Sequence, residues 1–453
     1  MAASLNETGS KILYAGSASI FKTNFDAFIR SLDANPGKES AAQAAELYLD
    51  LNSYLAEWTL KPLIAKGELA QKDLDDAASA LAAFIKKNDP ALFSETEKEA
   101  TSIAASQTRK MCDKTRNAQL HTYWGHDYCT GMDHSLRRGA RFVTSNPAKI
   151  NLFRQENPEK WNTLLNEARN QNPGVDIERL ISIMFVKVTA INARVLRPIF
   201  DATGGSDGFV CVQTNPKNIG DSKKMLEEIL FWEEEYKREL GAGPVNVVYK
   251  LPAVKAAVEP VRELVSRGVR VCMTLNFTVT QHEVFGELIQ GGKHPGFVVL
   301  MSGFLDDNVA LELEKKGVAD PKKFASWAGV AVMRKSYAGI RARKWGGKVV
   351  PMAAAIRGPY TINCCLTDHA DAPVYFTTMT AKIEEFDGAE RALASEMEQP
   401  IPEEIMAGLA KSDIFNQAYN PDRLDMDGLN DFIPLQAVLK VFTEAYNDIE
   451  KSL

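Results

Sequence analysis

Long apolar stretches are missing from this chain of 453 residues. It contains no run of about eighteen apolar residues, the length that a helix needs to cross a bilayer. Residues 1–21 also lack the continuous apolar segment behind a basic start that marks a secretion signal. We therefore expect a cytoplasmic location and no membrane partner.

Positive charge and cysteine are scarce too. Acidic residues (59) outnumber lysine plus arginine (53), which gives a formal net charge of -6. The chain therefore lacks the broad positive field that attracts phosphate backbones, and we expect no nucleic-acid partner. The six cysteines form no CxxC pair and no zinc-like spacing, so we interpret them as reduced residues of the core.

A regular alternation of strand-like and helix-like segments begins after about residue 120. Short apolar and β-branched runs, typical of strands buried on both faces, are separated by amphipathic helical stretches. The expected strands are residues 123–127, 142–144, 209–212, 245–249, 269–273, 297–301, 348–352 and 374–376. Eight such units fit an α/β fold of the closed (β/α)8 TIM-barrel type better than an open sheet.

Helices are expected at both ends of the barrel sequence. Residues 1–115 are rich in Ala, Glu and Lys, show no strand pattern, and place Leu74 and Leu81 on one helical face. We therefore divide the chain into an N-terminal helical extension (1–115), the barrel (116–380) and C-terminal helices packed on the barrel (381–453).

The polar residues at the C-terminal ends of the expected strands form the candidate site, because the chemistry of such barrels lies there. They are Asp127, Asn146, Gln213, Lys250, Thr274, Ser302 and Arg357. Lys250 is the most informative, since a lysine on an apolar strand has two explanations. Its ammonium group reaches water at the strand end, or the group is desolvated and its free amine attacks a carbonyl carbon.

The segments around these residues resemble the transaldolase family of Schiff-base aldolases. The matching segments are 143–147 (VTSNP), 246–253 (NVVYKLPA), 268–278 (GVRVCMTLNFT), 298–304 (VVLMSGF) and 353–357 (AAAIR). They correspond to the family's Asn-Pro strand, its lysine strand, the strand that follows, the strand with a serine and an aromatic, and the strand that ends in a phosphate-binding arginine. The chain is identified by this resemblance as a divergent member with an N-terminal helical extension.

The resemblance implies a role for each matched residue. Lys250 would form an imine with a ketose phosphate, and Asp127 would carry the proton of the hydroxyl whose carbon–carbon bond breaks. Asn146 and Thr274 would position the dihydroxyacetone unit and a catalytic water. Because the enamine stays attached to the lysine until an acceptor arrives, ping-pong kinetics are expected.

The resemblance also implies the substrates. Ser302 and Arg357 would hold the phosphate end of the sugar, beside the aromatic ring of Phe304. The expected reaction moves a dihydroxyacetone unit from fructose 6-phosphate or sedoheptulose 7-phosphate to an aldose phosphate, in the pentose phosphate pathway. Small sugar phosphates are the expected partners, no metal or cofactor is expected, and a homo-oligomer is left open.

Three positions depart from the family pattern. Gln213, which we include among the catalytic residues, stands where transaldolases carry a glutamate; Cys272 replaces an asparagine; and Asp307 stands where a second phosphate-binding arginine is common. A glutamine at position 213 is a feature of aldolase-like members, so one alternative is a fructose-6-phosphate-aldolase-like enzyme that uses free dihydroxyacetone. The other alternative is a non-catalytic sugar-phosphate-binding protein.

Overall fold

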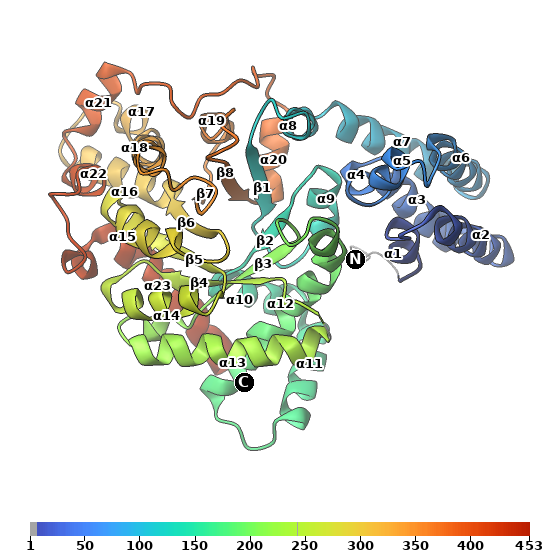
Figure 1. Cartoon of the computed structure of the whole chain (residues 1–453), viewed down its shortest axis with the longest axis horizontal. Coiled ribbons are helices and arrows are strands. Elements are labelled where there is room, and N and C mark those ends of the chain that lie inside the picture. Colours follow the sequence, from blue (N-terminus) through green and yellow to red (C-terminus); the bar gives the residue numbers. More distant parts are fainter. Residues whose placement is uncertain (1–6, 242) are drawn as a thin grey trace.

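Eight parallel strands close into a barrel in a computed structural model that describes residues 7–241 and 243–453 (Figure 1). Each strand pairs with the next along the chain, and the last pairs with the first. The strands are β1 (Thr122–His126), β2 (Phe142–Thr144), β3 (Phe209–Gln213), β4 (Val247–Pro252), β5 (Val271–Asn276), β6 (Gly296–Met301), β7 (Val349–Ala354) and β8 (Val374–Thr378). The predicted (β/α)8 barrel is confirmed.

The fourth and fifth strands lie further along the chain than their apolar pattern indicated, and the seventh is displaced less in the same direction. The predicted ends of the fourth and fifth strands, at residues 249 and 273, are followed by further ladder pairs that reach Pro252 and Thr274. The pattern stopped too early because the buried residues beyond it include polar side chains, among them Thr274 and Asn276. As a result Lys250 lies inside β4, and only two residues of the strand follow it.

Aromatic rings fill the N-terminal end of the barrel. The ring of Phe209 lies 5.1 Å from that of Phe142 and 5.3 Å from that of Phe297, and the Phe297 ring lies 5.3 Å from that of Tyr375. A Cβ atom on Gly125 would lie 2.4 Å from the Phe142 ring, so only glycine leaves room for this packing. The rings close this end, which leaves the opposite end of the barrel for a site.

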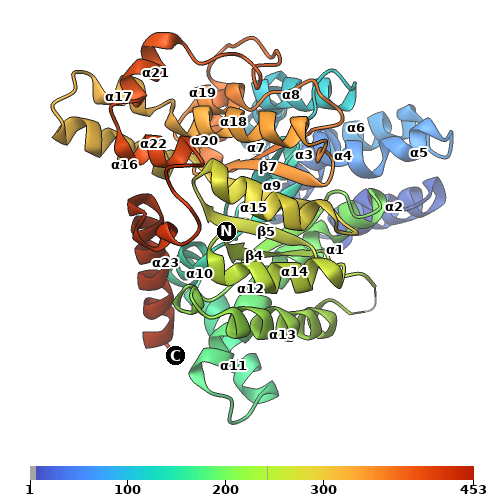
Figure 2. The same cartoon turned by 60° about the vertical axis from the view of Figure 1, so that its left-hand side comes forward.

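Helices surround the barrel (Figures 1 and 2). Those along the barrel sequence are α9 (Met132–Arg137), α10 (Pro147–Glu156), α11 (Pro158–Gln171), α12 (Ile177–Ala202), α13 (Ser222–Leu240), α14 (Val258–Ser266), α15 (Val279–Gln290), α16 (Ser302–Lys315), α17 (Pro321–Ala325), α18 (Ala328–Ala342), α19 (Pro359–Cys364) and α20 (Thr380–Asp387). Short 3-10 turns occur at η1 (Pro216–Asn218) and η2 (Lys255–Ala257). In α12 the side chain of Asp176 caps the first turn by accepting a hydrogen bond from the Arg179 amide at 2.7 Å, and Leu180, Met184 and Val188 recur on its buried face.

The N-terminal helices have a core of their own. They are α1 (Glu7–Leu13), α2 (Ala18–Ala34), α3 (Lys38–Leu51), α4 (Tyr54–Thr59), α5 (Lys61–Ala65), α6 (Gln71–Asn88) and α7 (Pro90–Ala105), whereas Met111 and Cys112 of α8 (Gln107–Arg116) belong to the core around the barrel. Figure 1 shows α1 to α7 gathered beside the barrel, in blue. Leu74 and Leu81, predicted on one helical face, are buried in this core. Residues 1–6 of the predicted extension lie outside the described residues, and the domain limits at 115 and 380 stay a prediction.

A buried arginine joins the N-terminal helices to the barrel. Arg137 on α9 donates to Asp50 of α3 at 2.7 Å and pairs with Glu46 at 2.6 Å. Four residues further along the chain, the guanidinium of Arg141 lies 4.7 Å from the ring centroid of Trp58. The extension is therefore attached through paired and desolvated charges as well as through apolar contact.

The C-terminal helices pack on the barrel. They are α21 (Glu403–Leu409), α22 (Asp413–Tyr419) and α23 (Ile433–Lys451), with the turn η3 (Gly428–Asp431) before the last. Helix α23 packs against α10, which follows β2, and Figure 2 shows the two side by side. Across the described ranges, none of the helices combines the length and apolarity that spanning a membrane requires.

Candidate active site

A cavity of about 310 Å³ opens at the C-terminal end of the barrel. Six of the eight predicted site residues line it: Asp127, Asn146, Lys250, Thr274, Phe304 and Arg357. Their side chains come from β4 and β5 or from the segments that follow β1, β2, β6 and β7. The structure therefore brings together residues that lie up to 230 positions apart in the sequence (357 - 127).

Lys250 projects into this cavity from β4 and is 6% exposed. Its Nζ donates to the backbone carbonyl of Ser145 at 3.0 Å. Ser145 is itself held, because its amide and its hydroxyl both donate to the carbonyl of Cys211, at 3.0 and 2.9 Å. Within the described residues no carboxylate oxygen lies within 4.0 Å of Nζ. The amine is thus fixed in position without a salt bridge.

Asp127 follows β1 and presents a carboxylate to the same cavity. Its Oδ1 accepts a hydrogen bond from Thr144 Oγ1 at 2.7 Å, and Thr144 Oγ1 lies 2.6 Å from Thr377 Oγ1. Its Oδ2 is 4.0 Å from Nζ of Lys149. One oxygen is therefore oriented by a hydroxyl, while the other is available to a ligand.

The loop that carries Asp127 is anchored by its neighbour His126. The Nε2 of His126 lies 2.7 Å from the carbonyl oxygen of Thr130, and Nδ1 lies 2.8 Å from Ser135 Oγ. Burial lowers the pKa of His126, which favours the neutral ring. His126 is a structural residue that fixes the end of β1.

Asn146 caps the start of α10 and also lines the cavity. Its Oδ1 accepts a hydrogen bond from the amide of Lys149 at 3.0 Å and so caps the helix, with Pro147 in the first helical position. The cap orients the side chain so that its Nδ2 remains a donor for a ligand.

Thr274 lies on the other side of Lys250, on β5, and is 1% exposed. Its Oγ1 lies 3.9 Å from the sulfur of Met301.

Cys272 gives the cavity an apolar side next to the lysine. It is the ladder partner of Lys250 on β5 and is fully buried. The thiol of Cys211 is in contact with it, and burial raises the pKa of Cys211 well above its usual value. Burial therefore favours the neutral thiol at Cys211, and the asparagine amide that the family places at position 272 has no polar substitute in Cys272.

Gln213 and Ser302 are not brought to the cavity. Gln213 pairs with Lys250 in the ladder, is 2% exposed, and its Oε1 finds no hydrogen-bond partner among the described residues. The hydroxyl of Ser302 donates to the carbonyl of Ala354 at 2.9 Å and lines a separate small space beside Gly329. Because α16 begins at Ser302 itself, its side chain turns towards β7.

Arg357 lies at the rim of the cavity with a partner that the sequence patterns did not predict. Its Nη2 is 2.7 Å from Asp307 Oδ2, and its Nη1 donates to the carbonyl of Ala355 at 3.1 Å. Its guanidinium carbon lies 5.0 Å from the ring centroid of Phe304. A Cβ atom on Gly303 would lie 2.1 Å from the Ala355 carbonyl oxygen, so this approach requires glycine.

Two residues next to the site have backbones in the left-handed region. Leu275, after Thr274, has a φ of 51°, and Ala355, near Arg357, has a φ of 58°. Each costs on the order of 1–2 kcal/mol in a residue with a side chain. Such conformations gather at functional sites, where packing holds them in place.

Several cavity residues were not predicted from the sequence. Lys149, Lys382 and Met379 line the cavity from α10, α20 and the segment before α20. The start of α10 offered a signal for Lys149, because the first turn after a strand end lies next to the site. Val441 and Phe442 reach the cavity from α23, and no local pattern indicates that contact.

No cluster suited to a metal ion is present in the part of the chain that the structure describes. The polar groups that the cavity offers are amines, a guanidinium, a carboxylate, an amide and hydroxyls. Such a set can form an imine, exchange a proton and hydrogen-bond to a polyol.

Comparison with known proteins gives a consistent family. Residues 131–433 match the model of the family described as Transaldolase/Fructose-6-phosphate aldolase. A protein named Transaldolase 1 from Streptomyces avermitilis is 28% identical over 178 residues, which is 36% of this chain and 45% of that protein. A transaldolase from Mycobacterium ulcerans is 24% identical over 208 residues, covering 43% of this chain and 53% of the relative. The chain spans about half the length of these relatives.

Proposed function

Because the chain belongs to the transaldolase/fructose-6-phosphate aldolase family, we propose that it moves a dihydroxyacetone unit from a ketose to an aldehyde acceptor through an imine on Lys250. One observation carries the proposal. A buried lysine with no salt bridge and a carboxylate line the same cavity, and an amide and a hydroxyl line it with them. The pentose phosphate pathway and the cytoplasm remain the expected setting.

The first half of the reaction uses Lys250 and Asp127. The Lys250 amine attacks the ketone carbon, water leaves, and a protonated imine forms. Asp127 removes the proton from the hydroxyl two carbons away from the imine carbon. The bond between the carbon that carries this hydroxyl and the carbon next to the imine then breaks, its electron pair moves into the imine to give an enamine, and the aldehyde fragment departs.

The second half reverses these steps with a new acceptor. The enamine carbon attacks the acceptor aldehyde, and the new alkoxide takes the proton from Asp127. Water then hydrolyses the imine, which returns the free amine of Lys250 and releases the new ketose. The Asn146 amide and the Thr274 hydroxyl bind the hydroxyls of the three-carbon unit and the water.

A related function is favoured by Gln213. The residue is the ladder neighbour of Lys250 and carries an amide with an unpaired oxygen, so it cannot act as a base. Without a carboxylate there, release of free dihydroxyacetone competes with transfer. The aldolase-like reaction is therefore the second candidate, and it shares the imine and the role of Asp127.

Reduction with borohydride tests the proposal directly. Dihydroxyacetone is added to the protein, the imine is reduced, and the modified peptide is identified by mass spectrometry. We expect the adduct on Lys250 and its loss in Lys250→Ala and Lys250→Arg, because a guanidinium does not form an imine. Lys149→Ala is the matched control, since it removes another lysine of the same cavity and should leave the adduct in place. An unmodified protein would support the non-catalytic alternative.

A further inference from the structure

The ion pair between Arg357 and Asp307 neutralises the residue that would otherwise bind a phosphate. Besides the 2.7 Å contact of Nη2, Nε lies 3.3 Å from Asp307 Oδ2, so two nitrogens of the guanidinium face one carboxylate. The third nitrogen, Nη1, donates to the Ala355 carbonyl. All three nitrogens of Arg357 therefore have an acceptor inside the protein.

The other cations of the cavity are paired as well. Lys149 lies 4.0 Å from Asp127, and Lys382 donates to Glu385 at 2.5 Å. Together with Arg357 and the reactive Lys250 they are the only basic residues that line this cavity in the described chain. Apart from the reactive lysine, each cation that lines this cavity in the described ranges therefore has a carboxylate partner.

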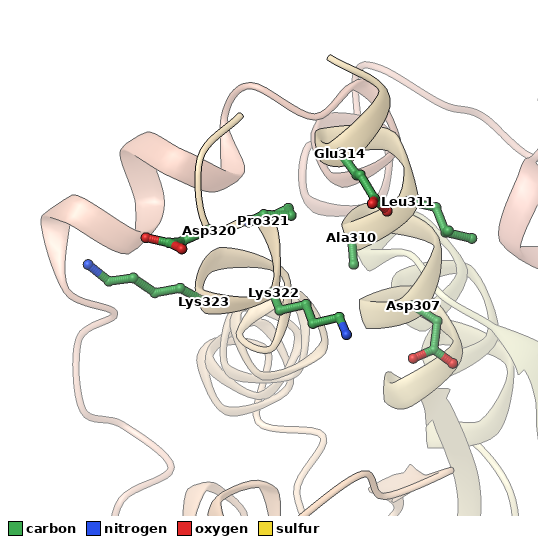
Figure 3. Close-up of a pocket in the computed structure, with 8 residues that line it drawn as sticks. All are labelled: Asp307, Ala310, Leu311, Glu314, Asp320, Pro321, Lys322 and Lys323. Atoms are coloured by element: carbon green, nitrogen blue, oxygen red, sulfur yellow. The ribbon is translucent and has the colours of Figure 1, made fainter. Parts of the chain in front are cut away.

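Asp307 also faces a second cavity, of about 600 Å³, between α16 and α17. Figure 3 shows Lys322 pointing from α17 towards α16, while Lys323 points away from it. Lys323 pairs with Glu404 at 2.6 Å, and no lysine of this second cavity lies within 4.0 Å of the Asp307 carboxylate. Among the described residues, Arg357 is therefore the cation that forms an ion pair with Asp307.

A phosphate group and a hydroxyl group would bind differently to the ion pair of Arg357 and Asp307. A phosphate dianion at Arg357 would also meet the negative charge of Asp307, and it would have to displace that carboxylate to gain the two parallel hydrogen bonds of an arginine–phosphate contact. A hydroxyl group can accept from Arg357 and donate to Asp307 at once, without breaking the pair. The pair therefore matches a polyol.

We propose that Asp307 is a specificity-determining residue, which ties up Arg357 and makes the site select sugars whose far end carries a hydroxyl instead of a phosphate. This inference rests on the imine chemistry proposed above. It assigns the substrate class as short unphosphorylated aldehydes and the ketoses formed from them. The Phe304 ring, stacked against Arg357, helps to keep the guanidinium in its paired position.

The test measures the reaction in the direction of synthesis, with dihydroxyacetone as donor. Glyceraldehyde and glyceraldehyde 3-phosphate serve as acceptors, because they differ only in the phosphate. We expect kcat/KM for glyceraldehyde to exceed that for the phosphorylated acceptor by about tenfold or more. Asp307→Asn and Asp307→Arg should raise kcat/KM for the phosphorylated acceptor by about tenfold or more and lower the value for glyceraldehyde, whose hydroxyl loses its carboxylate acceptor, so that the ratio of the two acceptors shifts towards the phosphate.

Glu314→Gln is the matched control. Glu314 lies on the same helix and lines the same second cavity as Asp307, but among the described residues the ion pair of Arg357 is with Asp307 and not with Glu314. Its replacement should leave the ratio of the two acceptors as it is in the unaltered protein, which excludes a general effect of negative charge.

The outcomes separate this inference from the proposed function. Dihydroxyacetone supplies only the three carbons around the imine, so its borohydride adduct on Lys250 does not depend on Arg357. Absence of this adduct refutes the imine chemistry. If the adduct forms but the unaltered protein prefers the phosphorylated acceptor, the inference is wrong. It is equally wrong if both Asp307 variants keep the original ratio of acceptors.

Discussion

The hydroxyl of Thr144 donates to Asp127 Oδ1 at 2.7 Å, across the gap between the ends of β2 and β1. Thr144 also lies 2.6 Å from Thr377 at the end of β8, so three adjacent strands fix the position of one carboxylate. A proton carrier must stand at a defined distance from its substrate hydroxyl. In the proposed reaction the Thr144 contact provides that definition, while Oδ2 of Asp127 lies 4.0 Å from Nζ of Lys149 and can still accept from a substrate hydroxyl.

Replacement of Asp127 by asparagine should separate imine formation from bond cleavage. The amide keeps the shape and can still accept from Thr144, but it cannot take the proton, so we expect turnover to fall by about a hundredfold or more. Borohydride trapping of dihydroxyacetone on Lys250 should persist. Loss of trapping together with a fall in melting temperature would mean that Asp127 is structural.

Replacement of Thr144 by valine should have a smaller effect of the same kind. Valine keeps the volume but removes the donor, so the carboxylate loses its orientation and kcat should fall by roughly tenfold, with little change in the yield of trapped imine. Thr144→Ser, which retains the hydroxyl, is the matched control and should recover most of the activity. Equal kcat values for the valine and serine variants would contradict this role.

Introduction of a carboxylate at position 213 should change the fate of the three-carbon unit. Gln213→Glu places a base beside Lys250 in the ladder, and we expect the ratio of transfer to free dihydroxyacetone release to rise. The ratio is measured with one ketose in the presence and in the absence of an acceptor aldehyde. Gln213→Met, which has no acid–base group, should not raise it. If the Gln213→Glu variant still forms the trapped imine on Lys250 but its ratio is unchanged, the hypothesis of an aldolase-like reaction loses its support.

The barrel could be predicted because its strands are apolar in short, evenly repeated runs, a pattern that a closed parallel sheet produces. The exact ends of the strands could be predicted less well. The fifth strand was predicted to end at Met273, yet the ladder continues through Thr274. The prediction stopped early because Thr274 is polar although it is buried. The place of Lys250, two residues before the end of β4, followed from the ladder and not from composition.

The site was predictable where a side chain follows its strand, and less so where a helix or a distant segment intervenes. Asn146 and Lys250 line the cavity as positions at or near strand ends do. Ser302 turns away because it is already the first residue of a helix. The pairing of Arg357 with Asp307 depends on how α16 packs beside β7, and such tertiary contacts leave no local pattern.

The buried carboxyl of Asp306 should make stability depend on pH. Burial raises its pKa to about 8, although its Oδ1 accepts from the amide of Gly329 at 2.8 Å. The unfolded chain loses this proton near pH 4, whereas the folded protein keeps it up to about pH 8. Stability should therefore fall as pH rises through this window, by at most about 1.4 kcal/mol per pH unit from this group.

Urea unfolding at several pH values tests this dependence. Asp306→Asn keeps an oxygen for the Gly329 amide and removes the titration, so its unfolding midpoint should decline less between pH 5 and about pH 8 than that of the unaltered protein. Glu314→Gln, on the exposed side of α16, is the control and should follow the unaltered protein. Parallel curves for Asp306→Asn and the unaltered protein would show that Asp306 does not titrate in this range.

Truncation of Phe442 should affect both stability and substrate affinity. The side chain is 3% exposed and lines the cavity from α23, so Phe442→Ala should cost about 3–5 kcal/mol of stability and raise KM. Val438→Ala, one turn earlier on the buried face of the helix, is the control, because Val438 is buried without lining the cavity. It should lower stability while KM stays constant. A rise in KM in both variants would mean that KM follows stability alone.

Because α23 supplies part of the cavity wall, the site is completed late in synthesis. Lys250 and Asp127 leave the ribosome well before Val441 and Phe442, and the barrel itself closes only when β8 pairs with β1. Until residue 442 has emerged and α23 has docked, the lysine stands in a site without its outer wall. We therefore expect ribosome-bound chains that end before α23 to bind carbonyl compounds more weakly than the released protein, so that the last helix sets the moment at which a newly made molecule reaches its full affinity.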